Sequence, residues 1–223
     1  MDPRLNQSHC KRCGTCCVKG GPALHLEDLE IVQSGKIPLK DLYTIREGEL
    51  ARDNVKGGLE PVLSELIKIK GKGRTWTCLY YDEQSKGCAV YEDRPVECRV
   101  LDCTDTRAIE ALYDTRRLSR KDLLEGVPRL WDLVTEHEKR CACHLLADFA
   151  KRLEDAKDKA AAEKITEMVG YDSHLRAVIR EKGGPDPAMF DFLFGRPLTD
   201  ILPGFGLQCH RQGEKLVITP MGF

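Results

Sequence analysis

Residues 10–17 read Cys10-Lys11-Arg12-Cys13-Gly14-Thr15-Cys16-Cys17, and they hold four of the 11 cysteines in the chain. A gap of two residues lets a tight loop turn two sulfurs toward one ion. Gly14 lies within this loop, where the backbone often needs a positive φ angle. The stretch is polar, and glycines follow at positions 20 and 21. We therefore predict an irregular loop over residues 1–22.

A second group of cysteines lies in and after a segment that has the sequence pattern of β-strands. This group consists of Cys78, Cys88, Cys98 and Cys103. Residues 63–70 contain the alternation Leu66-Ile67-Lys68-Ile69-Lys70, which predicts a strand. Two further strands are expected over residues 74–80 and 88–91, so that the three form a short antiparallel meander. We expect the aromatic rings of Trp76 and Tyr91 to pack this meander.

Both groups have the chemistry of a transition-metal site. Cysteine binds metal as the thiolate, and a metal or a positive field shifts the thiol toward that form. Pro95 suits the first turn of a helix, which would place Cys98 near the positive end of the helix dipole. The basic residues that can offset clustered thiolates are Lys11, Arg12, Lys19, Arg94 and Arg99. The predicted metal ligands are Cys10, Cys13, Cys16, Cys17, Cys78, Cys88, Cys98 and Cys103.

Core burial and disulfide bonding both account for these cysteines less well than metal binding does. Unrelated buried cysteines would be scattered through apolar, periodic segments, whereas the first four lie in polar sequence. A disulfide scaffold needs an oxidising compartment, and the start of the chain, Met1 to Gln7, has no apolar signal segment. We therefore expect a cytoplasmic protein whose cysteines bind metal.

The composition and net charge argue against some classes of binding partner. No apolar run approaches the roughly 18 residues that cross a bilayer, so no membrane partner is expected. The net charge is −1, which argues against the positive surface of a nucleic-acid-binding protein. The expected partners are a metal ion or cluster and, in addition, another protein.

The cysteines and their neighbours together resemble a known family. The pattern is Cys10-x2-Cys13-x2-Cys16-Cys17, then Cys78, then Cys88-x2-Tyr91-x2-Arg94-Pro95-x2-Cys98-Arg99-x3-Cys103. It resembles the YkgJ-type cysteine-cluster proteins, also called the CxxCxxCC family, over residues 10–103. The resemblance implies chelation of zinc or iron, but no single activity. Flagellin lysine methylases look similar in the cysteine region, so methyl transfer is one function that the resemblance suggests.

The residues leave zinc and an iron–sulfur cluster open as the cofactor. Ligation by cysteine alone fits both. The run from Cys10 to Cys16 has ferredoxin-type spacing, but Cys17 follows directly, without the three-residue gap and the proline of that motif. Adjacent cysteines do not easily reach one ion in the same geometry, so one of the pair can serve a second metal or bridge two. The resemblance alone favours the cluster slightly.

Helical patterns account for most of the remaining chain. Before the strands, helices are expected over residues 26–34 and 38–45. After them, Ser119 is expected to cap a helix. One long helix is then expected from Arg129 to about Lys159.

The C-terminal part completes the prediction of the fold class. A helix over Asp172–Lys182 is expected to end at Gly183, and residues 207–219 are expected to form a hairpin around Gly213. The predicted class is α+β, with a cysteine-cluster metal-binding region at 1–118 and a mainly helical region at 119–223.

Three cysteines lie outside the predicted ligand set. Cys141 is in register with apolar residues of its helix, so we expect it in the core. Cys143 and His144 could donate to a metal, and His137, Cys141 and His144 have the spacing of one helix stripe. This leaves a helical metal site as a minor alternative. In an alternating strand, one of Cys209 and His210 is buried in any case.

Three functions follow from a cysteine-bound metal. The first is an iron–sulfur protein with redox chemistry or protein modification as its role. The second is a structural zinc module that binds a partner, and the third is a protein that passes metal on. Whether the chain is an enzyme stays open, because no acid–base pair or nucleophile stands out.

Overall fold

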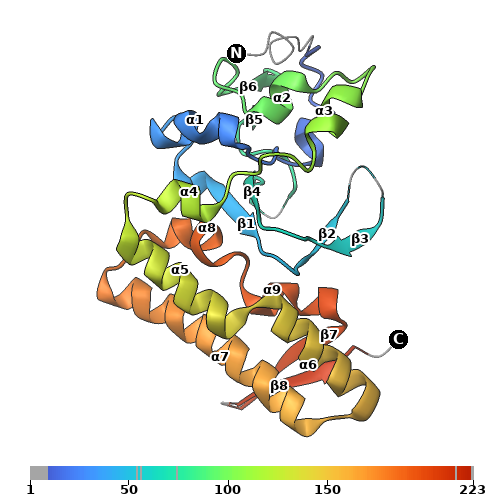
Figure 1. Ribbon diagram of the computed structural model, residues 1–223, viewed down its shortest axis with the longest axis vertical. Helices are drawn as coiled ribbons and strands as arrows, with labels where there is room; N and C mark the ends of the chain where they lie inside the picture. The colour runs from blue at the N-terminus through green and yellow to red at the C-terminus, as the bar shows by residue number, and fades with distance from the viewer. Residues whose placement is uncertain (1–9, 54, 56, 74, 214, 222–223) are drawn as a thin grey trace. The chain divides into compact units, whose positions relative to one another are not determined.

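The computed structural model describes residues 10–221, apart from residues 54, 56, 74 and 214. Contacts within the chain divide it into two compact units. The first unit combines the chain up to Tyr43 with Leu66–Gly126, and the second combines Thr44–Glu65 with Val127–Phe223. Figure 1 shows the order of the elements along the chain. The predicted boundary after residue 118 stays a prediction.

The first unit is built from short elements. Its helices are α1 (Leu29–Gln33), which follows a 3-10 turn at Leu26–Asp28, α2 (Val96–Val100), α3 (Arg107–Leu112) and α4 (Arg120–Leu124). Its strands include β4 (Leu66–Ile69), β5 (Tyr81–Asp82) and β6 (Gly87–Cys88). The fully buried apolar side chains of this unit include Leu24, Ile37, Leu42, Ile67, Val96 and Leu118. Ser119 caps α4 as predicted, because its hydroxyl accepts from the Asp122 amide at 3.2 Å.

The α+β class is confirmed, and the strands come as separate pairs instead of one meander. The pairs are β1 (Leu42–Ile45) with β4, β2 (Leu50–Arg52) with β3 (Leu59–Pro61), and β5 with β6. The hairpin of β7 (Leu207–Gln212) and β8 (Lys215–Pro220) was predicted correctly. The strand expected over residues 74–80 was wrong, since Cys78 makes only an isolated bridge to Gly71.

The helix expected over residues 38–45 was also wrong. A 3-10 turn at Leu39–Asp41 leads directly into β1. The residues of β1 are Leu42, Tyr43, Thr44 and Ile45, three of which are aromatic or β-branched and favour a strand. Leu42 and Thr44 are fully buried with the half-buried Tyr43 between them, so the first three residues alternate as in a strand, and Ile45 is buried as well.

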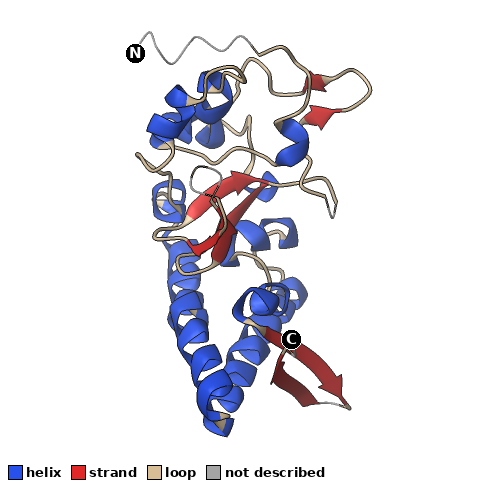
Figure 2. Ribbon diagram, turned by 90° about the vertical axis from the view of Figure 1, so that its right-hand side faces the viewer, coloured by secondary structure: helices blue, strands red, loops and turns tan. Residues whose placement is uncertain are grey.

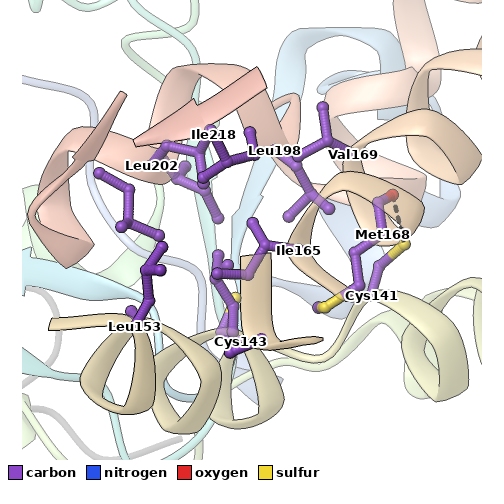
Figure 3. Packing of buried hydrophobic residues seen from close by; sticks show 14 residues of the cluster. Cys141, Cys143, Leu153, Ile165, Met168, Val169, Leu198, Leu202 and Ile218 are labelled. Carbon is purple, nitrogen blue, oxygen red and sulfur yellow. Dashed lines mark hydrogen bonds between the residues drawn. The ribbon is translucent and has the colours of Figure 1, made fainter. Parts of the chain in front are cut away.

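The second unit is dominated by helices, as Figure 2 shows. They are α5 (Pro128–Cys141), α6 (Cys143–Ala156), α7 (Lys159–Lys182), α8 (Phe190–Phe194) and α9 (Leu198–Ile201). The apolar faces of α5, α6, α7 and α9 form a cluster together with β7 and β8. Figure 3 shows Cys141 and Cys143 within this cluster, among residues such as Ile165, Val169 and Leu198.

The predicted long helix is interrupted twice. Ala142 has an extended backbone (φ −56°, ψ 134°) that ends α5, and Lys157 adopts a left-handed conformation that ends α6. The carbonyl of Cys141, left without a helical partner at this break, accepts from Nη1 of Arg46 at 3.0 Å. Gly183 ends α7 as predicted, with φ 74°. Within the described ranges, no helix has the length and hydropathy needed to span a membrane.

Candidate metal centre

The first cysteine loop is turned by Gly14, as the sequence predicts. Gly14 has φ +77°, and its backbone lies directly against the ring of Tyr81. A Cβ atom at this position would lie 1.9 Å from the Tyr81 hydroxyl oxygen. The loop then closes into a 3-10 turn at Cys17–Lys19, with the Val18 amide donating to the Gly14 carbonyl at 3.0 Å. Close contact with Tyr81 therefore fixes the part of the loop between Cys13 and Cys16.

The two cysteine groups meet through contacts that join their backbones and their neighbours. The amide of Cys78 donates to the carbonyl of Cys17 at 2.7 Å. Arg12, between Cys10 and Cys13, places its guanidinium carbon 4.0 Å from the ring centroid of Tyr91. Sequence segments that lie far apart are thus held side by side at two points.

The eight predicted ligands differ in exposure. Cys78 is buried and Cys13 and Cys103 are exposed, while the others are half-buried: Cys10, Cys16, Cys17, Cys88 and Cys98. The sulfurs of Cys16 and Cys17 lie 4.0 Å apart. The group thus forms a partly accessible surface region instead of an enclosed core.

Electrostatic interactions connect thiols of the two groups. Burial raises the pKa of Cys17 to about 12, and the neighbouring Cys16, Cys78 and Cys88 add to the rise. Burial likewise raises the pKa of Cys98 well above the ordinary value, with further contributions from Cys78 and Cys16. These thiols are protonated at neutral pH, so a metal that binds them must displace protons.

The pKa values of the two exposed thiols, Cys103 and Cys13, are also shifted by their surroundings. The pKa of Cys103 is raised by partial burial and then by Cys16, Cys13 and Cys10 of the first group. The pKa of Cys13 is lowered, mainly by its hydrogen bond with the Thr15 hydroxyl at 3.3 Å. Cys13 is therefore the thiol of the first loop whose ionisation its own surroundings favour.

The donor chemistry fits zinc or an iron–sulfur cluster, because both are bound by cysteine thiolates alone. Among the described residues, no three side chains of His, Cys, Asp or Glu are arranged closely enough to hold one ion. The structure thus joins the backbones of Cys17 and Cys78 directly without defining a coordination polyhedron in the part of the chain that it describes.

A buried carboxylate missed by the sequence analysis positions the helix that carries Cys98. Oδ1 of Asp28 accepts from the Val96 amide at 2.8 Å, and Oδ2 accepts from the His25 amide at 3.0 Å. Asp28 is fully buried, and burial raises its pKa to about 6. Asp28 therefore ties the start of α2 to the turn before α1. No local sequence signal links two residues 68 positions apart.

A second buried network lies next to Cys98 and was also missed. Oε2 of Glu97 accepts from the Ala23 amide at 2.7 Å, and Oε1 lies 3.2 Å from both Nε2 of His25 and Nη1 of Arg117. Lys68 lies near this carboxylate, and burial lowers the pKa of its ammonium group. Glu97 thus connects the segment before α1 to the helix that carries Cys98.

Two expectations about aromatic residues need correction. Trp76 does not pack a meander, since 64% of its side chain is exposed. Tyr91 contacts two guanidinium groups, from Arg12 at 4.0 Å and Arg94 at 3.6 Å. The Tyr91 ring therefore contacts charged side chains more than it packs in an apolar core.

The cysteines outside the predicted set belong to the second unit. Cys141 is in the core as predicted, and Cys143 is equally buried. His144 is exposed, and the break at Ala142 removes the regular helical spacing between it and Cys141. His137 is buried and bonds Oδ1 of Asp172 at 2.9 Å. These residues therefore do not form the stripe that a helical metal site would need.

The two candidate residues of the terminal hairpin differ in exposure, but neither is fully buried, so the burial expected for one of them is only partial. Cys209 packs against the apolar cluster and His210 is exposed.

The cysteines of the two groups have the donor chemistry of a metal-chelating domain. Residues 9–115 match the model of the CxxCxxCC family, described as a "putative zinc- or iron-chelating domain", so this region of the chain is similar to that family. No curated protein and no solved structure matches the chain. The predicted similarity to flagellin lysine methylases stays a prediction.

Proposed function

We propose that Cys10, Cys13, Cys16, Cys17, Cys78, Cys88, Cys98 and Cys103 bind zinc or an iron–sulfur cluster. The observation that supports this most directly is the hydrogen bond from the Cys78 amide to the Cys17 carbonyl, at 2.7 Å. It joins the two cysteine groups, and the mutual effects on thiol pKa extend the connection to Cys98 and Cys103. Binding requires the side chains to turn toward a common point and to lose their protons.

An iron–sulfur cluster would supply electron transfer, and the chain's role would then be redox chemistry or modification of a protein. The ferredoxin-type spacing of Cys10, Cys13 and Cys16 supports this form. Eight thiols exceed the four of one cluster, so the surplus would serve a second metal or stay free. Cys13 and Cys103 are exposed and would keep such a cluster within reach of a partner.

A structural zinc site is the second candidate, and the shortness of the elements favours it. None of the helices described in the first unit exceeds the six residues of α3, and the turn at Cys17–Lys19 has no buried residue. A metal would add the stability that this loop does not obtain from apolar burial. In this form the bound zinc would hold the loop in place for a protein partner. Alternatively, the chain would pass its zinc on to such a partner.

Protein purified without oxygen should be tested by elemental analysis and an optical spectrum. Visible absorption with stoichiometric iron and sulfide supports the cluster, and colourless protein with stoichiometric zinc supports the structural site. Replacing Cys98 by Ser should lower the bound metal, whereas Cys209→Ser, outside the ligand set, should leave it unchanged. Protein that binds neither metal, or a Cys98→Ser variant with full occupancy, would contradict the proposal.

A further inference from the structure

Two arginines share one aromatic ring at the junction of the cysteine groups. The guanidinium carbon of Arg94 lies 3.6 Å from the centroid of the Tyr91 ring, and that of Arg12 lies 4.0 Å from it. The two charges are thus within about 8 Å of each other, close enough to repel. Arg12 belongs to the first cysteine loop, whereas Tyr91 and Arg94 lie between Cys88 and Cys98.

The charge of this arginine pair is not balanced by a carboxylate of the described residues. Among the residues that the structure describes, neither Arg12 nor Arg94 forms an ion pair. In addition, Nε and Nη1 of Arg94 are buried and have no hydrogen-bond partner in the part of the chain that the structure describes. A buried donor without a partner is costly, and more so when it carries charge. Two adjacent positive groups, one of them with unpartnered donors, are the arrangement expected beside an anionic group.

Other basic residues of the first unit contrast with this pair. Arg117 bonds Glu97 at 3.2 Å, Lys36 bonds Asp93 at 2.6 Å, and Arg107 pairs with Asp105. Each of these charges has its own carboxylate. Arg12 and Arg94 differ from these three residues in that they share one aromatic ring and neither has a carboxylate partner among the described residues.

We propose that Arg12, Tyr91 and Arg94 form a clamp that holds the first cysteine loop against the second cysteine group and supplies positive charge to metal-bound thiolates. This inference rests on the proposed function. Tyr91 supplies the π-face that both guanidinium groups contact. The unpartnered N–H groups of Arg94 donate to sulfur when the thiolates carry the negative charge of a bound metal site. All three are positioning residues, since the sulfurs alone bind the metal.

The first test measures zinc affinity by competition with a chromophoric chelator. Arg94→Gln and Arg12→Gln should each weaken zinc binding by about tenfold or more, the usual effect of losing a partner behind the ligands. Arg94→Lys, which keeps the charge but not the planar donors, should recover part of the loss. Arg107→Gln is the matched control, because it removes an exposed arginine of the same unit, and it should bind zinc as the unchanged protein does.

The second test detects the clamp in protein stripped of metal. Tyr91→Leu removes the π-face, so amides of residues 10–20 should exchange hydrogen faster, while Tyr91→Phe, which keeps the face, should protect them as before. Arg12 is exposed, so Arg12→Gln leaves the core intact and should show the same faster exchange.

The outcomes separate this inference from the proposed function. Normal zinc affinity in both arginine variants, or unchanged exchange in Tyr91→Leu and Arg12→Gln, overturns the clamp while the metal site stands. Unchanged protein that binds neither zinc nor iron overturns both.

Discussion

Gly14 and Gly35 adopt the same left-handed backbone conformation in different surroundings, with φ +77° and +78°. A Cβ on Gly14 would lie 2.3 Å from Cζ of Tyr81, whereas a Cβ on Gly35 would meet nothing within 4 Å. Gly35→Ala should therefore cost only the conformational term of about 1 kcal/mol. Gly14→Ala should cost about 1–3 kcal/mol more, because the buried Tyr81 ring must shift. Chemical denaturation measures the difference, and equal losses in the two variants would show that the contact with Tyr81 is unimportant.

Asp28 gives the first unit a pH dependence with a definite sign. Burial raises its pKa from 3.8 to about 6 in the folded protein, so between these values the folded protein binds more protons than the unfolded chain. The free energy of unfolding must then fall as the pH rises from about 4 to 6, by about 3 kcal/mol in total from this group.

The comparison with Asp28→Asn isolates this contribution. Asn does not titrate, so the variant should be less stable overall, because an amide replaces an oxygen that accepts from a backbone N–H, but the fall with pH due to residue 28 should be absent. Denaturation of metal-free protein at several pH values between 4 and 7 measures both. A wild-type protein and variant with parallel pH profiles would contradict the raised pKa.

At the scale of single elements, Asp158 begins the longest helix. Its Oδ1 accepts from the amides of Ala160 at 2.9 Å and Ala161 at 3.3 Å, and its Oδ2 pairs with Arg152 at 2.6 Å. Asp158→Ala should lower the free energy of unfolding by about 1 kcal/mol, since two helix-start amides lose their acceptor. Asp158→Asn keeps an acceptor and should lose less. Glu163→Ala, at an exposed position of the same helix, is the control, and an equal effect there would refute the capping role.

Elements were predictable where a neighbour in the sequence decides them. Ser119, Gly183 and the hairpin at residues 207–219 act through partners a few positions away, so their signals are local. The pairing of β4 with β1 was not predictable, because alternation shows that a segment is a strand but not which strand it joins. The helix break at Ala142 was not predicted for the same reason. The carbonyl that it frees, that of Cys141, has its partner in Arg46, which lies far away in the sequence.

The candidate site likewise combines features that the local sequence predicts with contacts that only the folded chain shows. The cysteine spacing carried the prediction of a loop turned by Gly14, and the family match over residues 9–115 agrees with that pattern. The contacts of Asp28 with Val96 and of Arg12 with Tyr91 join residues distant in sequence. Only the folded chain brings them together, so no local pattern could assign their roles.

At the scale of the whole molecule, metal removal should act on part of the chain. Gly14 is the only residue of 10–20 that is buried, so this loop has little apolar anchorage of its own. The second unit instead has a buried cluster that runs from Cys141 on α5 to Ile218 on β8. Since metal binding contributes folding free energy where the ligands lie, its removal should loosen the cysteine segments and leave the α6–α7 cluster protected.

Hydrogen exchange with and without a chelator measures this directly. We expect amides of residues 10–20 and 76–90 to lose protection by about tenfold or more, which corresponds to about 1.4 kcal/mol of local opening. Amides of α6 and α7 should exchange as before, because their protection arises from Leu146, Ile165 and Val169, all fully buried. Cys98→Ser should reproduce the loss without chelator, and Cys209→Ser should not. Loss of protection spread evenly over both units would instead mean that the metal stabilises the chain as one cooperative whole.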